Sequence, residues 1–61
     1  MEALRLLTIK EAAPLLSLSE PALRRLIQGG HIPVVRLSAR RLRIHIADLA
    51  AFIETNRSGQ E

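Results

Sequence analysis

A pair of glycines, Gly29 and Gly30, separates two parts of the sequence with different hydrophobic periods, and this change most constrains the fold. The segment before the pair sorts its apolar and polar residues onto two faces at about 100° per residue, which is typical of a helix. After the pair, residues 41–46 alternate strictly between polar and apolar side chains, which is typical of a strand. The sequence therefore predicts helices followed by a small β structure.

The first predicted helix begins at Thr8. The segment from Thr8 to Glu11 matches a capping box, in which the threonine hydroxyl accepts from the glutamate amide and the glutamate side chain reaches back. Pro14 then falls within the expected helix and removes a hydrogen bond to the Lys10 carbonyl, at a cost of about 3 kcal/mol in a helix interior. The helix is therefore either short and kinked or begins later, and we favour the early start.

The second predicted helix begins after Ser19, the preferred N-cap. Glu20 suits the positive end of the helix dipole, and Pro21 falls in the first turn, where a missing amide does no harm. A competing capping box from Ser17 to Glu20 would place Pro21 deeper in the helix. The glycine pair is expected to end the helix, because glycine readily adopts the left-handed conformation found after helix C-termini. One arc of the helix carries Glu20, Pro21, Arg24, Arg25 and Gln28, and the other carries Ala22, Leu23, Leu26 and Ile27.

A β-hairpin and a third helix are expected after the glycines. Residues 34–37 are β-prone, and residues 41–46 should direct Leu42, Ile44 and Ile46 to one side and Arg41, Arg43 and His45 to the other. The intervening residues lack the glycine or asparagine of a two-residue turn, so a slightly longer loop built on a type I turn is expected. In the third helix, Leu49, Phe52 and Ile53 should form an inward stripe, with Asp48 in the first turn.

The composition argues against an enzyme. A chain of 61 residues buries only about 60% of the surface that its unfolded form exposes, which leaves little room for a deep pocket. There is no cysteine, no glycine-rich phosphate loop and no pair of carboxylates at useful spacing, so we expect no catalytic residue, cofactor or metal site. His31 is expected beside the last carbonyls of the second helix, and His45 at an exposed strand or cap position.

The basic residues indicate a polyanionic partner. The formal net charge is +3, with Arg24 and Arg25 on the displayed helix face. A second group, on or beside the hairpin, comprises Arg36, Arg40, Arg41 and Arg43. Arginine presents a planar fork of donors that suits phosphates and guanine edges. The alternative is a solvated face with surface pairs such as Arg24 with Glu20. Two separate basic surfaces favour nucleic acid.

The expected localisation is cytoplasmic. The first seven residues contain Glu2 and no long apolar run, so a signal peptide is not expected. No stretch approaches the roughly 20 apolar residues of a membrane span, and the apolar faces of the short helices are needed for the core, so we expect no membrane partner.

The order of the elements predicts a mostly α domain with a small β-hairpin, namely a winged helix-turn-helix, in residues 1–56, followed by a polar tail in residues 57–61. The segments LLTIKEAA, LSLSEPALRRLIQGGHIP, RRLRI and ADLAAFI together resemble the excisionase-family DNA-binding domain, a small MerR-like winged helix-turn-helix. The resemblance covers about four-fifths of the chain. It departs from the family pattern at Pro14 and in the wing loop LSARR, which lacks the glycine common there.

This resemblance implies a double-stranded DNA partner. It assigns the recognition-helix contacts to Pro21, Ala22, Arg24, Arg25 and Gln28, and the wing contacts to Arg40, Arg41 and Arg43. Arg36 joins the candidate DNA contacts because it belongs to the arginine cluster at the hairpin. Family members typically belong to phages, plasmids or integrative elements, and many are recombination directionality factors. We therefore expect cooperative self-association on adjacent sites and DNA bent for a site-specific recombinase (an integrase). A small transcriptional regulator is the alternative, and a protein-interaction module is a weaker one. The sequence shows no MerR-type dimerisation helix or effector domain after the third helix, which argues against a small-molecule sensor.

Overall fold

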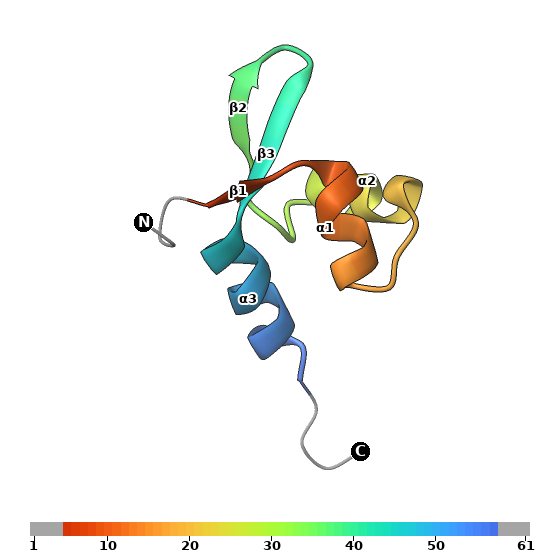
Figure 1. The fold of residues 1–61 in the computed structure, drawn as a ribbon. Helices are drawn as coiled ribbons and strands as arrows, with labels where there is room; N and C mark the ends of the chain where they lie inside the picture. Colours follow the sequence, from red (N-terminus) through yellow and green to blue (C-terminus); the bar gives the residue numbers. More distant parts are fainter. Residues whose placement is uncertain (1–4, 58–61) are drawn as a thin grey trace.

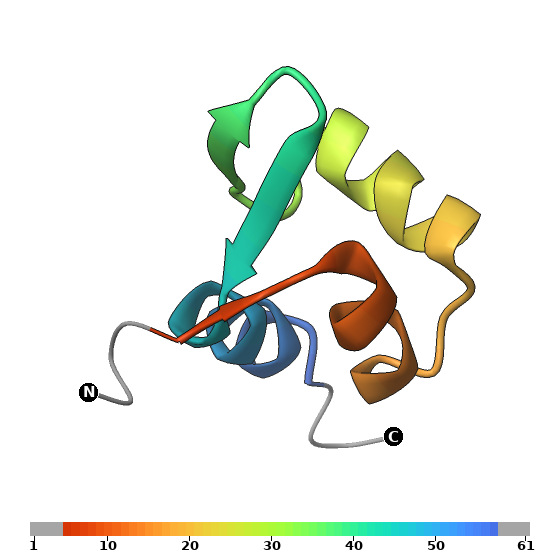
Figure 2. The ribbon, with the colours of Figure 1, turned by 45° about the horizontal axis from the view of Figure 1, so that its top comes forward.

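Three helices and a three-stranded antiparallel sheet make up the computed structural model, which describes residues 5–57 (Figure 1). The elements in chain order are β1 (Leu6–Leu7), α1 (Ile9–Leu15), α2 (Glu20–Gln28), β2 (Val35–Ser38), β3 (Arg41–His45) and α3 (Ile46–Thr55). Helices α1 and α2 form a helix-turn-helix, and the hairpin of β2 and β3 forms its wing (Figure 2). The predicted fold class is confirmed. Of the predicted polar tail, residues 58–61 lie outside the described residues.

The start of α1 is fixed by the predicted capping box. Thr8 Oγ1 accepts from the Glu11 amide at 3.0 Å, and the Thr8 amide donates to Glu11 Oε1 at 2.9 Å. Pro14 lies inside the helix, one residue before its end at Leu15. The early start is therefore confirmed, and the helix is short, because proline cannot donate the hydrogen bond that an interior residue would supply.

The turn between the two helices is a Schellman motif. The Ser17 amide donates to the Pro14 carbonyl and the Leu18 amide donates to the Ala13 carbonyl, each at 3.0 Å. Ser17 has a φ of +57° and is the one non-glycine residue with positive φ in residues 5–57. A serine thus occupies the left-handed position that glycine usually takes after a helix.

Helix α2 begins at the predicted N-cap. Ser19 Oγ accepts from the Ala22 amide at 3.2 Å, so Ser19 rather than Ser17 caps the helix. Pro21 consequently lies in the first turn. There it removes an amide that has no partner within the helix, so the proline helps to fix where the helix starts.

The end of α2 repeats the motif that ends α1. The Gly30 amide donates to the Ile27 carbonyl at 3.1 Å, and the His31 amide donates to the Leu26 carbonyl at 3.0 Å. Gly30 has a φ of +80°, as predicted for a glycine after a helix. The chain therefore leaves α2 sharply and turns back toward the sheet.

Strand β1 was not expected from the sequence. The sheet order is β1-β3-β2, and Leu7 of β1 lies opposite Ile44 of β3. The Ile46 amide also donates to the Arg5 carbonyl at 3.0 Å. The segment before the first helix is therefore tied to the base of the wing, which keeps the wing and the helix-turn-helix in one body.

The wing turn is shorter than predicted. Ser38 pairs with Arg41, which leaves Ala39 and Arg40 as a two-residue connection. The register shifts between Arg36 and Ser38, so one residue of β2 has no partner in β3. The expected longer loop was wrong, because this bulge in the strand accommodates the extra residue that a longer loop would have held.

The wing strand continues directly into α3. The predicted strand pattern extended to Ile46, but the strand ends at His45 and Ile46 is the first residue of the helix. His45 Nδ1 accepts from the Ala47 amide at 3.0 Å and caps the helix. The alternative of a cap position for His45 is confirmed.

The inward stripe of α3 is only partly as predicted. Leu49 is buried and Phe52 is half-buried, but Ile53 is 43% exposed. Including Ile53 in the inward stripe was therefore wrong. The core covers the first turns of α3 and does not reach the side of the helix where Ile53 lies.

The core lies between the helix-turn-helix, the sheet and the start of α3. Its buried residues are Leu7, Ile9, Ala12, Ala13, Leu23, Ile32, Ile44 and Leu49. Every helix and strand except β2 contributes to this core. Ile32 is the core residue that lies outside them, in the loop after α2. Among the described residues no polar or charged side chain is buried, so aliphatic packing stabilises the domain.

Candidate nucleic-acid interface

The outer face of α2 is fully displayed. The side chains of Glu20, Pro21, Arg24, Arg25 and Gln28 are exposed, as the helical projection predicts. Leu23, on the opposite face, is completely buried. Ala22 is half-buried, so it presents less surface than the other four residues assigned to the recognition helix by the resemblance.

The wing supplies a second set of cations. Arg36, Arg40 and Arg41 are exposed, and Arg43 is half-buried. The Nη1 atom of Arg43 donates to the Leu42 carbonyl at 2.9 Å, which holds this side chain close to the strand. Arg40 belongs to the two-residue turn at the wing tip.

A concave surface joins α2 to the wing. A cavity of about 220 Å³ is lined by Thr8, Ile9, Lys10, Glu20, Arg24, Arg40, Leu42 and Arg43. These residues come from the start of α1, the first two turns of α2 and the far half of the wing. The fold therefore brings Arg24 of the helix together with Arg40 and Arg43 of the wing, although at least 15 residues of sequence separate them.

A second cavity, of about 170 Å³, continues this surface along α2. Its lining comprises Ile9, Arg24, Ile27, Gln28, Arg36 and Leu42. Arg24 lines both cavities, whereas Arg25 and Arg41 line neither. Within the predicted set, Arg24 and Gln28 thus face the wing, while Arg25 lies on another side of the same exposed face.

Two residues on this surface were missed by the sequence reasoning. Lys10 lies in the first turn of α1 and Glu20 at the start of α2, and both line the larger cavity. From the sequence, Glu20 was interpreted as a residue that suits the helix dipole, and Lys10 was given no role of its own. Their spacing from the capping residues Thr8 and Ser19 could have found them, because residues of a first helical turn share the surface around the cap.

Within residues 5–57, no salt bridge involves the arginines of α2 or of the wing. The salt bridge found there joins Glu54 of α3 to Arg57, the residue after the helix C-cap, at 3.2 Å. Both side chains are about 70% exposed. The surface pair between Arg24 and Glu20 that the sequence allowed does not form. The arginines of α2 and the wing therefore remain available to an anionic ligand.

Positive charge also acts on the capping box. The pKa of Glu11 lies below its ordinary value of 4.5, chiefly because the Thr8 backbone amide donates to its carboxylate. The Thr8 hydroxyl, Arg5 and Arg43 lower this pKa further. The positive charge of the wing therefore reaches Glu11 through Arg43.

Residues 5–57 contain no group of three or more histidine, aspartate or glutamate side chains that could hold a metal ion. None of the helices described is long and apolar enough to cross a membrane.

Comparison with known proteins identifies the family. The model of a family described as a helix-turn-helix domain matches residues 6–57, from β1 to just beyond α3. No curated protein and no solved structure matched the chain. The family includes excisionase-type domains, in agreement with the resemblance seen in the sequence. The match covers most of the chain and all of its helices and strands, and the chain therefore belongs to the helix-turn-helix domain family of DNA-binding domains.

Proposed function

We propose that the chain is a non-enzymatic, sequence-specific DNA-binding protein that occupies adjacent sites and shapes the DNA for a site-specific recombinase. The observation that carries the proposal is the concave basic surface shared by α2 and the wing. A duplex that accepts α2 in its major groove would bring its backbone against the wing. One surface would then contact both a groove and the neighbouring phosphates.

The roles of the helix residues follow from their directions. Arg24 and Gln28 face the wing, so they would reach base edges where the helix lies deepest in the groove. Arg25 lies beside them and would contact a phosphate. Pro21 and Ala22 are in the first turn and would make apolar contacts, for example with a thymine methyl group.

The wing residues would hold the DNA backbone or enter a minor groove. Arg40 is at the tip, and Arg41 and Arg43 follow it on β3. Arg36 lines the smaller cavity beside Gln28 and would contact the strand between helix and wing. Each phosphate neutralised contributes about −0.9 to the slope of log affinity against log salt, so four such contacts give a slope of about −3.6.

The excisionase role is supported by the small size of this surface. One protomer with few contacts binds weakly, so several protomers on adjacent sites are needed for a stable complex. Bending a site of 20–30 base pairs by 40–90° costs on the order of 1–6 kcal/mol, which several cooperating protomers could offset. A mobile genetic element and its integrase would supply the context for such a factor.

A small transcriptional regulator is the second candidate, because it would use the same DNA-binding surface. A protein-interaction module is a third, since Leu15, Leu37 and Ile53 are exposed. The arrangement of the DNA sites separates the first two, and binding to DNA separates both from the third.

Selection of bound duplexes from a random pool, followed by salt titration of the selected sequences, tests the proposal. Direct repeats bound cooperatively are the expected result for an excisionase. Inverted repeats would favour a dimeric regulator. Recovery of no sequence above background would refute sequence-specific binding by the chain alone.

A further inference from the structure

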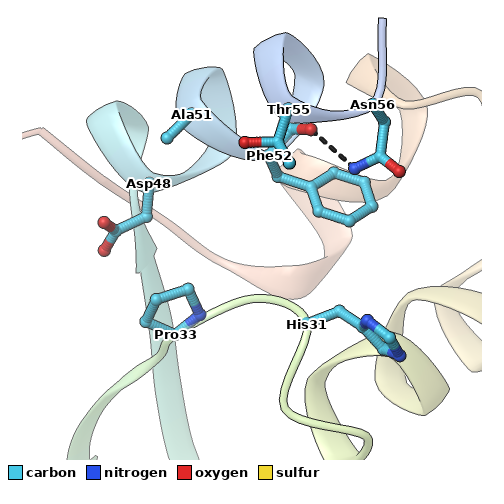
Figure 3. Close-up of a pocket in the computed structure, with 7 residues that line it drawn as sticks. All are labelled: His31, Pro33, Asp48, Ala51, Phe52, Thr55 and Asn56. Atoms are coloured by element: carbon cyan, nitrogen blue, oxygen red, sulfur yellow. Dashed lines mark hydrogen bonds between the residues drawn. The ribbon is translucent and has the colours of Figure 1, made fainter.

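A third cavity lies away from the basic surface, between α3 and the loop after α2. Its volume is about 310 Å³. Figure 3 shows Phe52 of α3 and Pro33 of the loop on opposite sides of it, with the Asp48 carboxylate toward one end and the His31 imidazole toward the other. None of the residues assigned to DNA binding lines it. The volume is at the lower limit of small-molecule pockets, and it suits one or two inserted side chains.

An exposed apolar feature lies at the other end of the molecule. Leu37 is 55% exposed and Val35 is 37% exposed, and both belong to β2, the outer strand of the wing. The bulge between Arg36 and Ser38 leaves Leu37 without a partner in the sheet. Figure 1 shows the wing tip and α3 at opposite ends of the fold. Neither the core nor the arginine contacts explain an exposed leucine at this place.

The hairpin is basic, whereas the α3 cavity carries one acidic side chain, Asp48, because Glu54 on the same helix is paired with Arg57. The hairpin, residues 35–45, contains four arginines and no acidic residue. Helix α3 contains Asp48 and Glu54 and no basic residue. A wing from one protomer and the α3 cavity of another are therefore complementary both in charge and in apolar character.

We propose that Leu37 of one protomer inserts into the α3 cavity of the next, with the basic wing near Asp48. The contact joins two different surfaces, so it is heterologous and continues from copy to copy without closing. This contact rests on the proposed function, since binding to adjacent DNA sites would hold the protomers close together. The interface is small, so it acts on DNA and forms no stable dimer in dilute solution.

Two single variants separate the halves of this interface. Leu37→Ser removes the inserted side chain, and Ala51→Arg fills the cavity from an exposed position on α3. Both positions are exposed, so the fold is retained. Leu15→Ser is the matched control. Leu15 is 58% exposed on α1, so this variant makes the same leucine-to-serine change at an exposed position away from the wing.

On a duplex with two adjacent direct repeats, each of the two variants should lose on the order of tenfold in cooperativity, which corresponds to about 1.4 kcal/mol. Affinity for a single site should stay unchanged for Leu37→Ser, and Leu15→Ser should behave as the unaltered protein. An equimolar mixture of Leu37→Ser and Ala51→Arg should recover cooperativity. When the two proteins occupy the adjacent sites in one of the two possible orders, the intact wing of Ala51→Arg faces the intact cavity of Leu37→Ser. A mixture that fails to recover overturns the proposal. So does a Leu37→Ser protein that loses single-site affinity equally, since Leu37 would then contact DNA.

A measurement without DNA keeps the contact testable if the proposed function fails. Nitrogen-15-labelled Leu37→Ser protein is titrated to millimolar concentration with unlabelled Ala51→Arg protein. Amide shifts should appear at Phe52 and Thr55 of the labelled protein, and they should be absent when the unlabelled partner is Leu37→Ser. Equal shifts in both mixtures, or none in either, overturn the contact. Loss of all DNA binding with these shifts retained would refute only the proposed function.

Discussion

Arg24 and Arg25 are adjacent in sequence, yet replacing each with alanine should have a different effect. Arg24 lines both cavities between α2 and the wing, and Arg25 lines neither. Arg24 is therefore expected to read a base and Arg25 to contact a phosphate.

The magnitudes differ in kind. Loss of a bidentate contact to a base costs about 1–3 kcal/mol of discrimination, so Arg24→Ala should lower affinity for the preferred site roughly 5- to 150-fold. Affinity for unrelated DNA should fall much less. Arg25→Ala should reduce the steepness of the slope of log affinity against log salt by about 0.9, for every DNA sequence. Over a tenfold change in salt, from 1 M to 0.1 M, this amounts to about eightfold in affinity.

The assay is a fluorescence-anisotropy titration of the selected site and of a scrambled duplex at several salt concentrations. Arg57→Ala is the matched control, because Arg57 is paired with Glu54 beyond the end of α3. It removes one arginine without touching the basic surface and should leave both the slope and the discrimination unchanged. Uniform weakening of both duplexes by Arg24→Ala, with the same change in slope as Arg25→Ala, would refute the assignment.

Three further predictions concern stability, each measured by denaturant or thermal unfolding. Ser17 and Gly30 both have positive φ, a conformation that glycine adopts more easily than serine. Ser17→Gly should therefore stabilise the domain by up to about 1 kcal/mol, and Gly30→Ser should destabilise it by about 1 kcal/mol. A stability change of the same sign for both variants would contradict this explanation. Leu23→Ala should cost about 2–5 kcal/mol, because Leu23 is fully buried, and a loss under 1 kcal/mol would show that the site collapses. The folded pKa of Glu11 lies below 4.5, so its stabilising effect is complete above pH 4.5 and is lost as pH falls through the folded value. Glu11→Gln should therefore reduce the acid-dependent loss of stability in urea titrations from pH 7 to pH 3, and an unchanged pH dependence would rule out this role.

The helix ends could be predicted because their signals are local. The hydroxyl of Thr8 or Ser19 and the amide it accepts from are three residues apart, so a short stretch of sequence contains the whole interaction. Gly30 is equally local, because its left-handed conformation depends on its own lack of a side chain. The displayed face of α2 followed from the helical period in the same way.

The features that were missed depend on residues distant in sequence. Strand β1 has two residues and acquires its structure by pairing with β3 nearly 40 residues later, so no pattern within it indicates a strand. Ile53 has the spacing of a core residue, but periodicity does not tell how wide the buried side of a helix is. Lys10 and Glu20 look like ordinary helix-end residues until the wing is folded against them. The concave surface itself is thus a property of the tertiary fold.

The direct junction between β3 and α3 makes the wing and the last helix a single lever. His45 is both the last residue of the strand and the cap of the helix, with no flexible residue between them. At 1.5 Å per residue α3 is about 15 Å long, so a tilt of the wing by about 10° would move the far end of α3 by roughly 3 Å. A tilt of β3 would therefore be passed directly to α3, since no loop separates the two elements.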